Sequence, residues 1–135
     1  MARRIILYVL VLAAIAAGYG IYEFNRGPKS LENVSPAWQI DASDLANGFL
    51  ENEEEANQKF LGKVIEVRGK LSDVINDSTS TSIVLETTDM MTSIICELAD
   101  NIDTDNLVIG DSLTVKGECS GFLMDVVLTK SIIES

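Results

Sequence analysis

Two cysteines, Cys96 and Cys119, are the side chains with the clearest capacity for chemistry in this 135-residue chain. They do not form a Cys-x-x-Cys motif, so the sequence predicts no thioredoxin-like redox site. Each cysteine falls at an inward-facing position of a predicted strand, in phase with the apolar residues around it. This is expected for two buried thiols that pack as small apolar groups. The alternative is a disulfide across the 22 intervening residues, which would stabilise the fold by about 3 kcal/mol through loop-closure entropy. Both interpretations stay open on the sequence.

Other side chains that commonly carry catalysis or bind metals are scarce or badly spaced. The chain has no histidine, which removes histidine general bases, Ser-His-Asp triads and histidine ligands. It has no phosphate-binding glycine loop, and no carboxylate pair stands out as general acid and base. Asp100, Asp103 and Asp105 lack the glycine and distal glutamate of a calcium loop, so turn chemistry explains them better. We therefore expect no enzyme, no catalytic residue, no metal site and no cofactor site.

The charge is divided unevenly along the chain. The first 30 residues carry +3 and the remaining 105 carry −14, which together give the net charge of −11. A domain this acidic repels nucleic-acid phosphates and anionic lipid surfaces at long range. The charge therefore favours a basic partner or a cation-rich medium.

An uncharged run of 18 residues from Ile5 to Tyr22 predicts a membrane anchor. As a helix it would span roughly 27 Å, close to the hydrocarbon thickness of a bilayer. Arg3 and Arg4 precede the run and favour a cytoplasmic N-terminus. We expect residues 1–24 to form a single-pass transmembrane helix and the following domain to be extracytoplasmic, in the periplasm. A signal peptide cleaved near Ala14-Ile15-Ala16 is the alternative.

A linker and an amphipathic helix are expected next. Residues 25–40 contain both prolines and show no periodicity, which predicts a linker. Residues 43–61 carry an apolar stripe at helical spacing, formed by Leu45, Phe49, Ala56 and Phe60. Asp41 or Ser43 could cap this helix, and Gly62 would end it. Asn52 falls within the stripe and could make a specific hydrogen bond. The acidic side chains of residues 51–55 point in different directions on a helix, so they predict a solvated face rather than a metal site.

A period of two residues replaces the helical period after Gly62 and predicts five strands. The first strand should be long, with a bend or bulge between Gly69 and Asp73. The expected strands cover residues 65–75, 82–87, 92–98, 113–119 and 125–133, with a short polar connection or helical turn at 100–109. We therefore predict a mainly β domain at 41–135, a five-stranded OB-fold-like barrel with an N-terminal amphipathic helix, preceded by the transmembrane helix.

Several short motifs resemble those of one known family. They are Asn52-Glu53 followed by Ala56, Lys59 to Gly69, Gly110-Asp111, Leu113 to Gly117, Cys119, Gly121, and Asp125 to Leu128. Across residues 44–133 the chain resembles the tRNA_anti-like family, small bacterial OB-fold domains with a leading helix, often behind an export signal or anchor. The resemblance implies the OB fold. It implies little about activity, because a shared scaffold does not specify a site.

The sequence therefore favours a membrane-anchored, extracytoplasmic OB-fold module that binds a protein or an envelope component. The expected site is the barrel face of the first three strands, where other OB-folds bind ligands. The alternative is single-stranded nucleic-acid binding, which needs a basic groove with aromatic platforms. The acidity of the domain disfavours this alternative. Phe49 and Phe60 are also expected in the apolar stripe of the helix, where they would not be available to bases. The sequence does not indicate any small-molecule ligand.

Overall fold

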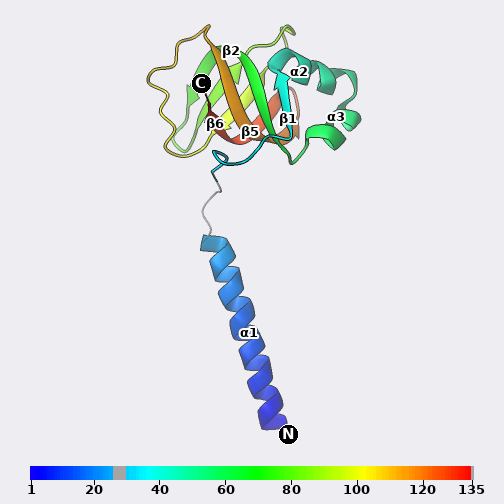
Figure 1. The fold of residues 1–135 in the computed structure, drawn as a ribbon, viewed down its shortest axis with the longest axis vertical. Helices are drawn as coiled ribbons and strands as arrows, with labels where there is room; N and C mark the ends of the chain where they lie inside the picture. The colour runs from blue at the N-terminus through cyan, green and yellow to red at the C-terminus, as the bar shows by residue number, and fades with distance from the viewer. Residues whose placement is uncertain (26–29, 135) are drawn as a thin grey trace.

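The computed structural model describes the backbone of residues 1–25 and 30–134, and the side chains of 1–23 and 30–134. The first helix, α1, runs from Ala2 to Asn25. Its segment Ala2–Glu23 is 22 residues long and apolar enough to cross a membrane, and none of its residues is buried in the protein. The N-terminal apolar helix is thus confirmed, and Figure 1 shows it projecting from a β-rich domain.

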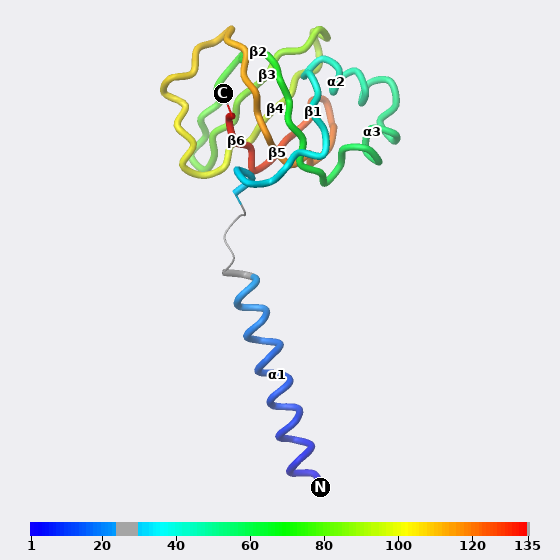
Figure 2. Tube along the Cα trace, viewed as in Figure 1, coloured from blue at the N-terminus to red at the C-terminus, as the bar shows by residue number. Residues whose placement is uncertain are grey.

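Five strands form a closed, mixed barrel (Figures 1 and 2). They are β2 (Val64–Asn76), β3 (Thr81–Leu85), β4 (Ile94–Leu98), β5 (Ser112–Phe122) and β6 (Val126–Ile133). The spatial order is β2-β3-β4-β6-β5, and β5 pairs with β2 to close the ring. Only β4 and β6 run parallel within this ring. This is the predicted OB-fold-like barrel.

The long strand β2 closes the barrel by pairing with a different strand along each half. Residues 64–70 pair with β5, and residues 71–76 pair with β3. The register shifts between Leu71 and Asp73, which places the bulge inside the predicted region. Gly69 lies just before the bulge. A Cβ atom at this position would be 2.9 Å from Cβ of Ala42, which leaves no room for a side chain. The β4–β5 connection contains turns but no helix in residues 99–111.

Two helices, rather than the single expected one, precede the barrel. α2 covers Ala42–Glu51 and α3 covers Glu53–Phe60, so Asn52 separates them. Asn52 Oδ1 accepts a hydrogen bond from the N–H of Glu55 at 3.1 Å and caps α3. Asp41 precedes α2 without a side-chain cap, and Ser43 Oγ instead accepts from the N–H of Thr88. Gly62, at φ +75°, follows the helices as predicted.

The segment expected to be a linker is attached to the barrel over much of its length. Leu31 is only 4% exposed, and the N–H of Ala37 donates to the carbonyl of Val64 at 2.8 Å. Trp38–Asp41 form the strand β1, parallel to residues 65–68 of β2. Sequence periodicity could not reveal β1, because it is four residues long and mostly exposed. We call residues 30–37 the strap.

The core lies inside the barrel and under the two helices. Leu45 and Phe49 of α2 are buried together with Ile65, Ile83 and Leu128 of the strands, and further barrel residues complete the same cluster. Phe49 stacks on Phe122 at 5.5 Å between ring centroids. The helices therefore cover one end of the barrel, as Figure 1 shows.

Candidate binding face

The outer face of β3, β4 and β6 carries a short apolar row. Val84 pairs in register with Ile95, and Ile95 pairs with Val127. All three are half-buried and alternate along their strands with fully buried residues, so they face outward. Ser82, Glu97 and Thr129 continue this face. It is a smooth surface of small and β-branched side chains, and none of these six side chains is aromatic.

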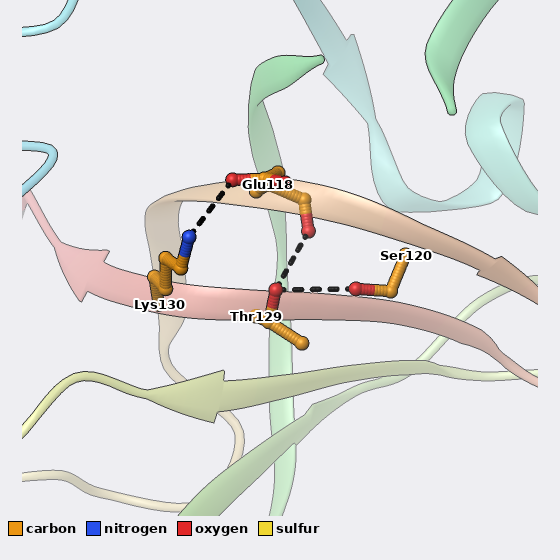
Figure 3. A network of polar contacts seen from close by, with 4 residues as sticks. All are labelled: Glu118, Ser120, Thr129 and Lys130. Carbon is orange, nitrogen blue, oxygen red and sulfur yellow. Dashed lines mark hydrogen bonds and ion pairs between the residues drawn. The ribbon is translucent and has the colours of Figure 1, made fainter. Parts of the chain in front are cut away.

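A polar network extends the same face onto β5 (Figure 3). Lys130 Nζ lies 3.4 Å from Glu118 Oε2, and Ser120 Oγ lies 3.1 Å from Thr129 Oγ1. The hydroxyl of Thr129 also reaches the backbone carbonyl of Glu118 at 3.5 Å. Lys130 is therefore already paired, although an ion pair this exposed contributes little stability.

A groove of about 650 Å³ lies beside this face. The strap forms one wall through Ser30 and Glu32, the end of β4 and residues 99–102 form another, and the end of β6 completes it. Three carboxylates line the groove, on Glu32, Glu97 and Asp100, against the single ammonium of Lys130. The groove therefore suits a ligand with cationic or hydrogen-bond-donor groups better than one with phosphates.

Two backbone positions in this groove are unusual. Asn101 has φ 66° and Lys130 has φ 54°, and they are the non-glycine residues with positive φ in the described part of the chain. Asparagine tolerates this conformation, but for lysine it costs about 1–2 kcal/mol. Lys130 lies where the β6 register shifts against both β4 and β5, which marks a bulge. Strained residues and bulges concentrate at functional sites, which supports the groove as the candidate site.

The local sequence indicated a left-handed backbone at Asn101 but not at Lys130. Asn101 follows Asp100 in a polar segment, where a left-handed residue is common. Lys130 lies inside a strand pattern, and nothing local distinguishes it. Its conformation follows from pairing with two neighbouring strands.

The structure places Cys96 and Cys119 on opposite sides of Leu128. Both are buried, free thiols, and each is in register with Leu128, Cys96 from β4 and Cys119 from β5. Two strand spacings separate their backbones by roughly 10 Å, whereas a disulfide needs Cα atoms within about 7 Å. This arrangement favours the interpretation as packed thiols, and the disulfide stays a prediction for chemical labelling.

Burial also makes both thiols poor nucleophiles. It raises the pKa of Cys96 to about 12. Burial raises the pKa of Cys119 as well, although a backbone hydrogen bond with Gly121 acts in the opposite direction. Since the thiolate is the reactive form, neither cysteine is suited to catalysis at neutral pH.

Lys116 and Asp103, which lie outside the groove, have structural partners. Lys116 is buried, and its Nζ lies 3.0 Å from Glu134 Oε1 and 3.3 Å from the carbonyl of Glu32 in the strap. Asp103 accepts from the N–H of Asp105 at 2.9 Å, which is the predicted turn chemistry. The described residues include no group of three or more His, Cys, Asp or Glu side chains arranged to hold a metal.

The aromatic rings of the barrel domain cluster around α2 and α3, away from the apolar row. Trp38 contacts Phe60 edge to face at 5.8 Å, and Lys59 Nζ lies 4.5 Å from the centre of the Trp38 ring. Phe49, Phe60 and Phe122 pack against one another in the core. Trp38 is 40% exposed, but it lies on β1 against Phe60 of α3 and not in the apolar row of β3, β4 and β6.

A known crystal structure shares this architecture. A crystal structure of a "putative nucleic acid-binding lipoprotein" from Klebsiella pneumoniae matches with a TM-score of 0.56 and 16% identity, covering 73% of this chain and 93% of that one. A "putative aspartyl-tRNA synthetase" from Leishmania major matches with a TM-score of 0.45 and 15% identity, covering 89% of this chain and 26% of that one. The Klebsiella likeness, at this identity, is one of fold.

Sequence comparisons agree with the fold. No curated protein matches the chain at a significant level. The profile of the tRNA_anti-like family matches residues 1–133, and these include all the motifs that carried the resemblance. The chain belongs to the tRNA_anti-like family.

Proposed function

We propose that this protein is a membrane-anchored, extracytoplasmic module that binds a protein or another envelope component in the groove beside its outer barrel face. The observation that carries the proposal is the groove itself, about 650 Å³ in volume. Asn101 and Lys130, the two non-glycine residues with positive φ in the described part of the chain, both line it. Its three carboxylates favour a ligand that brings cationic or donor groups.

The location rests on separate support. Arg3 and Arg4 precede the apolar helix α1, an order that favours a cytoplasmic N-terminus and an outward-facing domain. The similarly folded Klebsiella protein is described as a lipoprotein, which fits an extracytoplasmic setting. The strap would then hold the barrel close behind the membrane-spanning segment.

Nucleic-acid binding is the second candidate, because the Klebsiella protein is described as putatively nucleic acid-binding. The physical features of this chain oppose it. The groove is acidic, its lysine is paired with Glu118, and the apolar row has no ring on which a base could stack. We expect labelled single-stranded oligonucleotides not to bind the full-length protein at low salt, even at high micromolar concentrations. Tight, salt-sensitive binding would favour this candidate instead.

Site-specific photo-crosslinking in native membranes tests the proposed function. A photo-reactive phenylalanine analogue replaces Glu97, which is exposed at the groove. The matched control carries it in place of Gln58, which is exposed on α3. We expect a discrete, light-dependent adduct from position 97 and none from position 58. No adduct at position 97, or the same adduct at both positions, would contradict the proposed groove.

A further inference from the structure

Four apolar side chains stand in solvent at the tips of two loops. Met90 and Met91, in the β3–β4 loop, are 100% and 79% exposed. Leu123 and Met124, in the β5–β6 turn, are 90% and 73% exposed. We call these four residues the methionine surface. Isolated exposed apolar residues are ordinary, whereas a group of them on neighbouring loops is typical of an interaction site.

Hydrogen bonds tie the two loops to each other. The N–H and the hydroxyl of Ser93 donate to Asp125 Oδ1 at 2.8 and 2.9 Å, and the N–H of Val126 donates to the carbonyl of Ser93 at 3.1 Å. Within the first loop, the N–H of Met91 donates to Asp89 Oδ1 at 2.8 Å. Because these contacts already order the loops, a partner would lose little affinity in ordering them.

The surroundings of the methionine surface are acidic. Ser43 of α2 accepts from Thr88 of the first loop at 3.1 Å, and Phe49 of α2 stacks on Phe122 beside the turn. The helices and both loops therefore share one end of the barrel. Residues 42–61, 86–93 and 123–125 together carry eight carboxylates and one lysine, Lys59, which lies over the Trp38 ring. Arg68 and Lys70 line a hollow together with Ser43 and Thr88, so the carboxylates at this end outnumber the cations by eight to three.

This combination of charge and apolar exposure selects one kind of occupant. An anionic membrane surface and a second copy of this end would each be repelled by the carboxylates. A basic, amphipathic segment is attracted by them and can place its apolar face on the exposed side chains. Methionine suits such a contact, because its unbranched and polarizable side chain adapts to irregular partners.

We propose that the methionine surface binds a basic amphipathic helix of a partner protein. The apolar side of that helix contacts Met90, Met91, Leu123 and Met124, and its lysines and arginines face the surrounding carboxylates. This surface is separate from the groove, so the inference goes beyond the proposed function and does not depend on it.

The test uses the full-length protein in zwitterionic nanodiscs. The probe is a labelled helical peptide of about 18 residues with leucine on one face and lysine on the other, and fluorescence anisotropy reports binding. We expect saturable binding that weakens with salt. The double variants Met90→Ser/Met91→Ser and Leu123→Ser/Met124→Ser should each weaken it about tenfold.

A matched variant and a scrambled peptide control this experiment. Val108 and Ile109 in the β4–β5 loop are each 58% exposed, and Val108→Ser/Ile109→Ser should leave peptide binding unchanged. A peptide of the same composition without an apolar face should bind at least about tenfold more weakly. The proposal is overturned if the scrambled peptide binds equally, if the control variant loses as much affinity, or if no peptide binds at about 100 µM. It is also overturned if the variants instead abolish binding to anionic vesicles or self-association.

Discussion

At the residue scale, the two cysteines show how strand register decides chemistry. Their alternating phase correctly placed both inside the barrel. Register then placed them on opposite flanks of Leu128 rather than next to each other. Two cysteines that both point into the barrel can therefore lie on strands that are not neighbours. The local sequence pattern is the same whether the two strands are paired or separated by a third.

Alkylation should show that both thiols are protected but reduced. Burial and a raised pKa slow the reaction of Cys96 and Cys119 in the folded protein. We expect iodoacetamide to label neither at neutral pH until denaturant is added, and then both without reductant, as read by intact mass. A cysteine introduced by Gln58→Cys should label quickly as the control. Labelling of Cys96 and Cys119 only after reduction would establish the disulfide instead.

A close approach between β5 and β6 should make Gly117 sensitive to substitution. A Cβ atom at Gly117 would lie 2.5 Å from Ser131 Oγ and 3.0 Å from Leu128 Cβ, and the Ser131 hydroxyl is buried without a hydrogen-bond partner among the described residues. We expect Gly117→Ala to lower the free energy of unfolding by about 1–3 kcal/mol. Urea denaturation measures this change.

Two further variants isolate the contact with Ser131. Ser131→Ala alone should be neutral or stabilising, because it removes an unsatisfied buried hydroxyl, and in the double variant it should recover part of the Gly117→Ala loss. Gly48→Ala in α2, where a side chain meets nothing within 4 Å, should be neutral or slightly stabilising. Equal losses at Gly48 and Gly117 would contradict the steric explanation.

At the element scale, the break between α2 and α3 comes from one side chain. The apolar stripe from Leu45 to Phe60 correctly predicted helical structure, because spacing reports which face is buried. It did not predict the break, since Asn52 leaves the helix to cap the second segment. The cap was visible only as a polar residue in the apolar stripe.

Removing this cap should destabilise the domain modestly. Asn52→Ala loses the hydrogen bond to the N–H of Glu55, which costs about 1 kcal/mol. Asn52→Asp keeps an acceptor and should retain most of the stability, whereas Gln58→Ala on exposed α3 surface should have little effect. Thermal unfolding followed by circular dichroism measures all three. If Asn52→Ala matches Gln58→Ala, the cap is not a stabilising contact.

The stability of the fold should depend on pH with opposite signs at two glutamates beside Lys116. Hydrogen bonding to Lys116, and then to Glu66, holds the pKa of Glu134 below its ordinary value of 4.5. Glu134 therefore stabilises the fold above that pH, and its contribution is lost as pH falls. The hydrogen bond with Glu134, and then burial, raise the pKa of Glu66. Ionised Glu66 consequently opposes folding as pH rises above 4.5.

Two single variants separate these effects. At pH 7, Glu134→Gln should destabilise by about 1–3 kcal/mol, because it leaves the buried Lys116 ammonium without its carboxylate. Glu66→Gln should be neutral or stabilising at the same pH. Urea titrations from acidic to neutral pH should show the Glu134→Gln deficit disappear in acid. A deficit that is constant with pH would contradict this assignment.

At the scale of the whole molecule, the folded unit begins before the point that composition indicated. The prolines and the lack of periodicity suggested a linker as far as residue 40. The structure instead buries Leu31 and joins the strap to Lys116 through the carbonyl of Glu32. The strap is therefore part of the domain's packing, and it also forms a wall of the groove.

Two chains that lack α1 test this boundary. A chain that starts at Ser30 keeps the strap, whereas one that starts at Trp38 loses it together with the burial of Leu31. We expect the shorter chain to be less stable by about 2 kcal/mol, measured by urea denaturation. The variant Leu31→Ala in the longer chain should reproduce much of the loss. Equal stability of the two chains would show that the strap is a true linker.

The sequence by itself determined the apolar N-terminal helix, the strand-rich domain, the OB-fold-like barrel with its bend in the first long strand, and the acidity that opposes nucleic acid. The helix, the strands and the acidity follow from local properties, because an uncharged run, a period of two and a charge count do not depend on which strands become neighbours. The barrel was predicted from the series of five strands together with the family resemblance. Tertiary structure alone decided the separation of the cysteines, the left-handed Lys130, the docked strap and the shared position of Met90, Met91, Leu123 and Met124. Each of these results from register and contacts between segments far apart in the chain, where one residue's environment is set by others that local sequence does not specify.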